Sequence, residues 1–389
     1  MNTARRTTIV VFILMLLTPC MFAQPPQVLW QRTFSQLPGV NYPASIVQAP
    51  DGNLIFGRTY HIGTNDKAAE VIKATADGEL IWRNGVDFVE GIYTFAHDVG
   101  VDTSGNAWLF GLYNIPWNGQ YPLLANYDNS GDRQWQRVAR SMREIPVRIT
   151  PLNDGGAALV AKGGVIARVD DLGHLIWQVD LDSTEAFVRM ADVIEYQGGL
   201  LFAGSWENYG LDEVLYFVHT NLDGDIIWEA HSTHAGPNMK GLLELEDGAF
   251  VALSYSPADQ LSLNWFEANG IYVTHVNFNL YRKSDWGPED NYSLALDRMP
   301  DGGFLIGGES DQHQAKLIRT DSDGNILWQM VNDGEIYHTV ITDVIRLEDG
   351  RIQCIGMKRY GGWTTWLIQL AAEGEVIDAA PVELPPVEW

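Results

Sequence analysis

A short segment in which a tryptophan follows a glycine by four residues recurs along the chain. KLIRTDSDGNILW at 316–328 is one copy, and six related segments begin at 70, 123, 165, 216, 263 and 367. Five of the seven copies keep the tryptophan, as Trp82, Trp135, Trp177, Trp228 and Trp328. A repeat of this length constrains the fold strongly, because each unit must bury its apolar surface against a neighbouring copy.

A second glycine turn recurs out of phase with the first. Its glycines are Gly52, Gly105, Gly155, Gly198, Gly248, Gly302 and Gly350, at steps of 53, 50, 43, 50, 54 and 48 residues. Each turn lies between short runs of aliphatic and aromatic residues, which is the signal of a tight β-hairpin. Two hairpins per period give four strands per repeat, at roughly 45–49, 53–60, 68–75 and 79–86 in the first.

Seven such units predict an all-β chain that folds as a seven-bladed β-propeller of four-stranded antiparallel blades. The tryptophans then lie on the outermost strands and pack their indoles against the adjacent blade. The segment QVLWQRTF at 27–34 resembles a fourth strand without the other three. We therefore expect this N-terminal strand, with Trp30, to close the ring on the last blade. An eight-bladed ring would need three further strands that the chain does not contain.

The N-terminus has the layout of a secretory signal peptide. Arg5 and Arg6 precede an apolar run, and a cleavage site could follow Ala23. A lipoprotein with Cys20 as the anchor is an alternative, although the preceding proline fits it poorly. We expect a signal peptide at 1–23, one propeller domain at 24–380 and a C-terminal tail at 381–389.

The sequence of the mature chain limits its possible partners and location. No later stretch approaches the roughly 18 apolar residues of a spanning helix, so we expect no transmembrane segment. Removing the signal leaves a net charge of (25 − 2) − 50 = −27, which argues against nucleic acid as a partner. Only Cys354 remains after cleavage, so no intrachain disulfide can form. The expected location is secreted, or periplasmic or at the cell surface.

The pattern D-x-x-G-x-x-x-W after an apolar strand resembles the repeat of quinoprotein-like propellers. That superfamily includes relatives of the pyrroloquinoline-quinone (PQQ-type) dehydrogenases and of an outer-membrane assembly scaffold lipoprotein. The resemblance covers nearly the whole mature chain and implies the fold more than a function. The quinone enzymes have eight blades, a vicinal disulfide and a bound calcium. Seven repeats and one cysteine imply the repeat signature without the quinone-enzyme site, and we expect no cofactor.

Two kinds of metal-site fragment occur in the sequence. D-S-D-G-N at 321–325 and N-L-D-G-D at 221–225 look like parts of a calcium loop but lack its glutamate near the twelfth position. His231 and His234 fall in a predicted connection between blades, without an evident third ligand. We interpret the first pair as hairpin turns and the second as loop histidines, and we expect no metal site.

Aromatic residues and acids are frequent in the connections that should open on one face of the ring. The ligand-face candidates are Trp117, Trp206, Glu207, Tyr209, Trp286, Glu289 and Trp363. Exposed aromatics beside carboxylates suit a sugar ring or a protein contact. Alternatively, these indoles only cover strand ends.

Equivalent positions on the innermost strands should form a ring around the axis. Counting seven residues back from each second-turn glycine gives Ser45, Asp98, Arg148, Ala191, Gly241, Ala295 and Asp343. Asp98 could hold Arg148 from the neighbouring blade, because a buried charge needs such a partner. Asp98, Arg148 and Asp343 are the axial-channel candidates, either as structural groups or as a ligand site.

These features favour an exported, non-catalytic propeller that acts as a binding or scaffolding module for a protein or glycan at the cell envelope or outside the cell. The alternative is a carbohydrate-active protein, lectin-like or a hydrolase or lyase, and a third option is a surface structural repeat. Catalysis is undecided, although the usual nucleophile, phosphate and zinc motifs are absent from the sequence. Close carboxylates in a deep axial pocket would favour an enzyme, and a broad aromatic surface would favour a scaffold.

Overall fold

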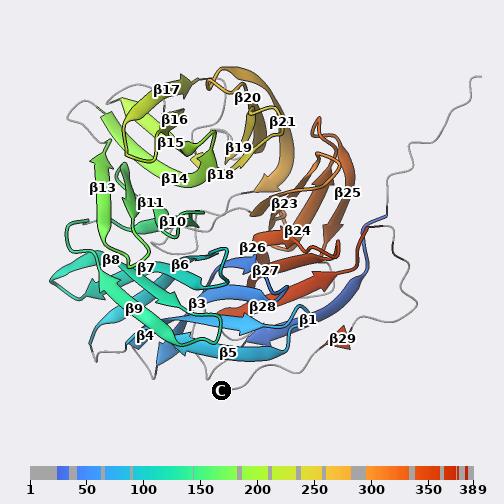
Figure 1. The fold of residues 1–389 in the computed structure, drawn as a ribbon. Coiled ribbons are helices and arrows are strands. Elements are labelled where there is room, and N and C mark those ends of the chain that lie inside the picture. The colour runs from blue at the N-terminus through green and yellow to red at the C-terminus, as the bar shows by residue number, and fades with distance from the viewer. Residues whose placement is uncertain are drawn as a thin grey trace, which may run out of the picture.

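The chain folds as a seven-bladed β-propeller, as the repeats predicted (Figure 1). The computed structural model describes residues 24–34, 42–62, 66–87, 91–142, 144–181, 186–208, 213–233, 238–255, 260–281, 295–332, 338–359, 363–373, 375 and 382–383.

Six blades consist of four strands that are consecutive in sequence. Blades one to three are β2 (Tyr42–Gln48), β3 (Leu54–Ile62), β4 (Asp66–Ala74) and β5 (Leu80–Gly85); β6 (Tyr93–Val101), β7 (Ala107–Ile115), β8 (Gly119–Tyr127) and β9 (Arg133–Val138); and β10 (Pro146–Pro151), β11 (Ala157–Ala161), β12 (Val165–Val169) and β13 (Leu175–Asp180). Blades four to six are β14 (Ala186–Tyr196), β15 (Gly199–Asn208), β16 (Val214–Thr220) and β17 (Ile226–Ser232); β18 (Asn238–Glu244), β19 (Phe250–Tyr255), β20 (Gln260–Phe266) and β21 (Tyr272–Tyr281); and β22 (Ala295–Arg298), β23 (Phe304–Glu309), β24 (Ala315–Thr320) and β25 (Ile326–Val331).

The seventh blade joins both ends of the chain. Its strands are β26 (Thr339–Arg346), β27 (Ile352–Arg359), β28 (Trp363–Leu370), β1 (Val28–Phe34) and β29 (Val382–Glu383). The N-terminal β1 runs antiparallel to β28, and the two strands lie side by side in Figure 1. The predicted closure is confirmed. Two residues of the expected C-terminal tail also add β29 to this blade, in parallel with β1.

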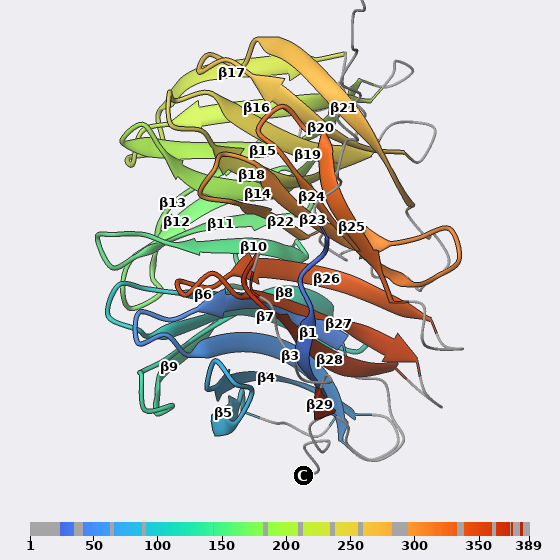
Figure 2. The same ribbon diagram turned by 90° about the vertical axis from the view of Figure 1, so that its right-hand side faces the viewer.

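The two faces of the ring differ in their connections. In an antiparallel four-stranded blade, the first and third hairpin turns lie at one end and the remaining connections at the other. We call these ends the hairpin face and the loop face, and Figure 2 shows the ring from the side, with the strands running between them. Strand one of each blade begins at the loop face.

The hairpin turns have the chemistry that their sequences indicated. In the β24–β25 turn, the Asp321 carboxylate accepts hydrogen bonds from the amides of Asp323 and Asn325 at 3.0 and 2.8 Å. Gly324 there has a φ of 84°, which glycine adopts without steric cost. The turn at 221–225 is built in the same way from an asparagine. Both fragments that resemble calcium loops are therefore hairpin turns.

The recurring tryptophan and glycine contact each other across blade boundaries. A Cβ placed on Gly131 of blade two would lie 2.7 Å from the ring of Trp82 of blade one. The Trp82 indole also donates a hydrogen bond to the Asn129 carbonyl of the same turn, at 3.1 Å. The same packing joins Trp30 to Gly78, Trp135 to Gly173, Trp177 to Gly224 and Trp228 to Gly270. The expected packing of the indoles against the adjacent blade is confirmed.

The core is divided among the blade boundaries. At the closing boundary, Phe34 of β1 packs edge-on against Phe56 of blade one, with ring centroids 5.1 Å apart. Cys354 is buried in the core between blades six and seven, and burial raises the pKa of its thiol. The fold is thus held by apolar burial and hydrogen bonds.

Substituting alanine at Gly131 should destabilise the protein more than the same change at Gly52. Both glycines have positive φ, +90° and +80°, but a Cβ at Gly52 meets nothing within 4 Å. The backbone strain of roughly 1–2 kcal/mol is common to both variants. Overpacking against Trp82 adds about 1–3 kcal/mol at Gly131. Urea unfolding measures the difference, which should shrink in a Trp82→Ala background. Equal costs in the parent chain would contradict the contact.

Replacing Trp30 with alanine should weaken ring closure. This side chain is 6% exposed, and its indole donates to the Gln369 side chain of β28 at 2.9 Å. Truncating a buried tryptophan typically costs about 3–5 kcal/mol of unfolding free energy. Trp117→Ala is the control, because Trp117 is fully exposed and its loss should leave the urea midpoint unchanged. Similar midpoints for the two variants would show that Trp30 does not close the ring.

Candidate functional site

The innermost strands carry a β-bulge at the same level in most blades. The pairing of strand one with strand two shifts register at Ala96/Asp98 in blade two and at Met239/Gly241 in blade five. Similar shifts occur in blades one, three, four and seven. A bulge re-aims side chains at the extra residue, so two neighbouring residues line the channel where regular pairing would place one.

Arg148 lies at the centre of a charged ring that these strands form. Its guanidinium contacts the Asp98 carboxylate of blade two at 3.5 Å and the Asp192 carboxylate of blade four at 2.9 Å. The expected pairing with Asp98 is present. Both carboxylates are buried, with 3% of each side chain exposed, so Arg148 balances charges on both of its neighbours.

Blade four contributes Asp192, and not the predicted Ala191, to this ring. The count of seven residues assumed the same turn in every blade. In blade four, Tyr196 pairs directly with Gly199, and the two-residue turn is formed by Gln197 and Gly198, both at positive φ. The equivalent position is therefore one residue closer to the turn.

The ring carboxylates also hold the backbone of the next blade. Asp98 accepts a hydrogen bond from the Ile149 amide at 2.8 Å, and Asp192 accepts one from the Leu242 amide at 2.8 Å. Ser45 does the same with the Val99 amide. Asp343 of blade seven accepts from the Ile46 amide of blade one at 2.9 Å. These side chains therefore link neighbouring blades.

Burial is the largest cause of the raised pKa values of the ring carboxyl groups Asp98 and Asp343. It raises the pKa of Asp98, and it raises the pKa of Asp343 to about 7, in both cases against the opposing effect of Arg148. The nearby carboxylates, Asp192 first, raise the pKa of Arg148, so the guanidinium stays charged. Burial and the nearby Lys162 lower the pKa of His97 to about 4, so this imidazole is neutral at pH 7.

A cavity of about 400 Å³ lies beside the ring, towards the loop face. The bulge residues His97, Val147, Ala191 and Lys240 line part of its wall. We call this cavity the loop-face pocket. A second cavity of about 350 Å³ continues along the axis, and its walls are mostly valine, isoleucine and leucine.

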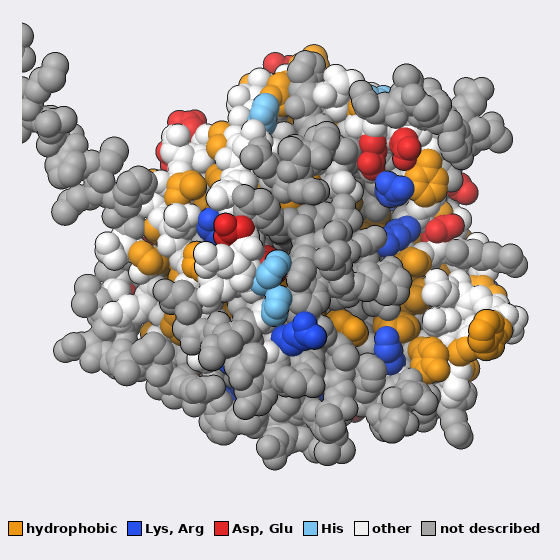
Figure 3. Space-filling view, turned by 180° about the vertical axis from the view of Figure 1, so that it is seen from behind, with side chains coloured by type: hydrophobic (Ala, Val, Ile, Leu, Met, Phe, Trp, Pro, Cys, Tyr) orange, Lys and Arg blue, Asp and Glu red, His pale blue; other side chains and the backbone are white. Residues whose placement is uncertain are grey.

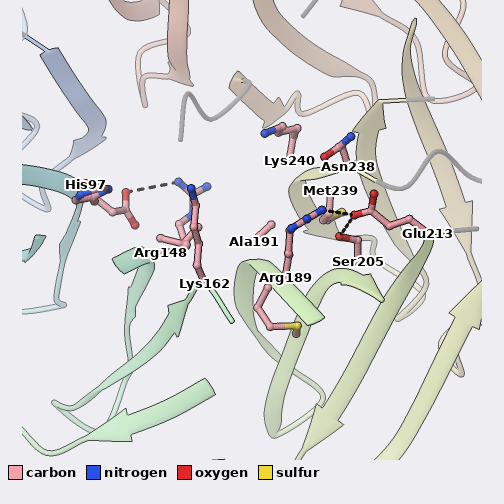
Figure 4. Close-up of a pocket in the computed structure, with 13 residues that line it drawn as sticks. His97, Arg148, Lys162, Arg189, Ala191, Ser205, Glu213, Asn238, Met239 and Lys240 are labelled. Carbon is pink, nitrogen blue, oxygen red and sulfur yellow. Dashed lines mark hydrogen bonds and ion pairs between the residues drawn. The ribbon is translucent and has the colours of Figure 1, made fainter. Parts of the chain in front are cut away.

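Basic side chains outnumber acidic ones in the loop-face pocket. Arg148, Lys162, Arg189 and Lys240 line it, against Asp98 and Glu213. Glu213 accepts hydrogen bonds from Arg189 at 3.2 Å and from the Ser205 hydroxyl at 2.6 Å, as Figure 4 shows. On the face seen in Figure 3, histidine side chains lie near the middle, and basic side chains are spread among acidic ones. The pocket can accept an anionic group, although the whole chain carries a charge of −25.

Of the predicted ligand-face residues, the structure describes the side chains of Trp117, Trp206 and Glu207. Trp117 is fully exposed at a hairpin tip with a φ of 67°. Trp206 is half-buried, with its ring edge-on to His231 at 5.0 Å, and Glu207 is half-buried after it on β15. The side chain of Trp363, on β28, lies outside the described residues, as do Tyr209, Trp286 and Glu289.

The prediction that His231 lies in a loop between blades is wrong. It is part of β17, and its ring stacks on Tyr216 at 4.7 Å. The side chains of His231 and Trp206 serve packing within blade four. His234 lies outside the described residues.

Sequence reasoning missed the basic residues of the loop-face pocket. Lys162, Arg189 and Lys240 come from three blades and share no motif, so their spacing along the chain carries no signal. Lys240 and His97 could have been found by considering the residue before each ring position, had the bulge been anticipated.

The comparisons with known proteins support the fold of this chain but indicate no function. No protein-family model and no curated protein matches the chain. A crystal structure of Raptor from Chaetomium thermophilum matches 90% of this chain and 30% of that chain, with a TM-score of 0.60 and 10% identity. The WD40 β-propeller domain of Doa1 matches with a TM-score of 0.56 and 10% identity, over 88% of this chain and 96% of that one. Both matches support the propeller fold, and the resemblance to quinoprotein-like repeats stays a prediction.

Asp343→Asn should flatten the dependence of stability on pH. A carboxyl group with a folded pKa of about 7 stabilises the fold most below the unfolded value of about 3.9. This contribution is lost as pH rises through about 7, because the unfolded chain releases the proton more readily. Urea midpoints of the parent and the variant, measured from pH 4 to 8, test this. Asp223→Asn, at an exposed turn, is the control. Parallel profiles for Asp343→Asn and the parent would contradict the prediction.

Proposed function

We propose that this chain is an exported, non-catalytic binding module whose partner protein inserts a carboxylate into the loop-face pocket. The observation that carries this proposal is the presence of four basic side chains around one cavity in a strongly acidic chain. Rigid inner strands of neighbouring blades hold the cavity wall, so the pocket is largely preorganised for a ligand.

The contacts of the ring carboxylates support binding over catalysis. Close acids in an axial pocket would favour an enzyme, and Asp98, Asp192 and Asp343 do cluster around Arg148. However, each of them accepts a backbone amide of the next blade. A general acid or base must instead exchange its proton with a substrate within hydrogen-bond reach. The carbohydrate-active alternative has no such free pair among the described ring residues.

Charge favours a protein over a polyanionic glycan as the partner. The net charge of −25 repels a long polymer with an acid on every sugar, whereas a short acidic segment of a protein can place a carboxylate in a locally basic pocket. The WD40-type propellers among the structural neighbours also favour a protein partner. Export rests on residues 1–23, which lie outside the described part of the chain. The described residues include no helix of the length and hydrophobicity that crossing a bilayer requires.

Calorimetric titration of the mature chain with a tetraglutamate peptide tests this proposal. We expect binding that weakens with added salt, and no binding of tetraglutamine. Lys162→Gln combined with Lys240→Gln should reduce the affinity at least about tenfold, because a hydrogen bond to a charged group contributes about 1.5–3 kcal/mol. Lys358→Gln, on β27 and outside the pocket, is the matched control and should bind like the parent.

Oligogalacturonate, titrated in parallel, distinguishes the glycan alternative. Binding of this glycan alone would overturn the choice of a protein partner. Binding of neither probe, or equal affinity of the double variant and the parent for tetraglutamate, would contradict the assignment of the pocket.

A further inference from the structure

Two histidines and a glutamate meet at the boundary between blades six and seven, away from the loop-face pocket. Glu309 ends β23, His313 lies in the turn that follows, and His338 immediately precedes β26. Their potential ligand atoms all lie within 4.8 Å of one another. The three residues come from two blades, so the fold assembles the group, and no local motif encodes it.

Direct contacts hold the three side chains of this group together. His313 Nδ1 lies 2.7 Å from the Glu309 carboxylate. The imidazoles of His313 and His338 stack with centroids 4.8 Å apart and planes inclined by 22°. Two imidazoles and a carboxylate oxygen are a common ligand set for zinc, whereas calcium and magnesium prefer oxygen ligands alone.

The backbone holds the group in place. His313 has a φ of 62°, which is uncommon for a residue other than glycine, although histidine adopts it more often than most residues do. Its amide donates to the Ser310 carbonyl at 3.1 Å, and its own carbonyl accepts the Thr339 amide at 3.1 Å. The second bond connects the turn of blade six to the first strand of blade seven. The Glu309 side chain is only 9% exposed, so its orientation is restricted as well.

We propose that Glu309, His313 and His338 form a zinc-binding site that ties blade six to blade seven at the loop face. A tetrahedral ion at about 2.0–2.1 Å from each ligand needs donor atoms roughly 3.4 Å apart. The present spacing of up to 4.8 Å must therefore shorten when an ion binds. Three protein ligands leave a fourth position for water or a group from a partner.

The chain contains a matched pair that lacks the third ligand. His174 Nδ1 lies 3.1 Å from the Asp170 carboxylate, with the same spacing of four residues as His313 and Glu309. Within the described ranges, no further histidine, cysteine or carboxylate completes a group of three there. His174 is therefore a control for weak zinc binding by a single histidine–carboxylate pair.

Calorimetric titration of the untagged, metal-free mature chain with zinc chloride tests the proposal. We expect one zinc per chain, no comparable magnesium binding, and a cobalt complex with the visible absorption of a four-coordinate site. Affinity should fall as the solution is acidified, because protons compete with zinc for the imidazole nitrogens. His313→Gly should lower zinc affinity by at least about tenfold, since even outer partners of a metal site contribute 10–100-fold.

Urea unfolding of the variants distinguishes the loss of a zinc-binding side chain from a loss of folding. Glycine suits the positive φ at 313, so His313→Gly should keep the urea midpoint of the metal-free parent. Zinc should raise the midpoint of the parent and of His174→Gln, but not that of His313→Gly. Failure of the parent to bind zinc, or equal zinc affinity in parent and His313→Gly, would overturn the proposal.

Discussion

The contact between an indole on one blade and a glycine turn on the next joins successive units of this propeller. The tryptophan needs a flat, open surface, and only a residue without a Cβ leaves that space in the turn it covers. The glycine also supplies the positive φ of the turn. Trp30 makes this contact with Gly78, so the ring is closed by the interaction that holds its other boundaries. No covalent link between the chain ends is needed.

A second set of contacts joins the blades near the axis. Ser45, Asp98, Asp192 and Asp343 each accept the backbone amide of the following blade. The outer contacts are largely indole packing and the inner ones are hydrogen bonds, so the boundaries that have both kinds of contact are held at both ends. This arrangement gives the loop-face pocket a rigid wall, which favours preorganised binding. The buried aspartates at the axis thus link neighbouring blades through the backbone amides that they accept.

The fold could be predicted from the sequence because its signals are local. Hairpin glycines, alternating apolar runs and the Gly-to-Trp spacing lie within single repeats, and seven copies reinforce one another. Even the closing strand was recognisable, because QVLWQRTF resembles the outer strand of the other blades. Where a repeat departs from the pattern, the structure compensates: Thr274 replaces the outer tryptophan of blade five, and Trp265 of β20 covers Gly324.

The candidate sites depended on information that no single repeat contains. One shorter turn moved the ring position from Ala191 to Asp192, and the bulges placed Lys240 and His97 in the pocket wall. The basic pocket and the His313–His338 pair join side chains of different blades, so sequence spacing gave no sign of them. The aromatic residues were conspicuous in sequence, yet Trp206 proved to pack within its own blade.

Hydrogen exchange measured by mass spectrometry tests the closed ring most directly. If β1 closes the ring as the other outer contacts join their blades, the β1 amides that hydrogen-bond to β28, together with the amides of β28, should open only with the whole domain. Their protection should then match that of central strands such as β7. Exchange of the β1 amides that is orders of magnitude faster than that of β7 would show that the ring is not closed by this strand.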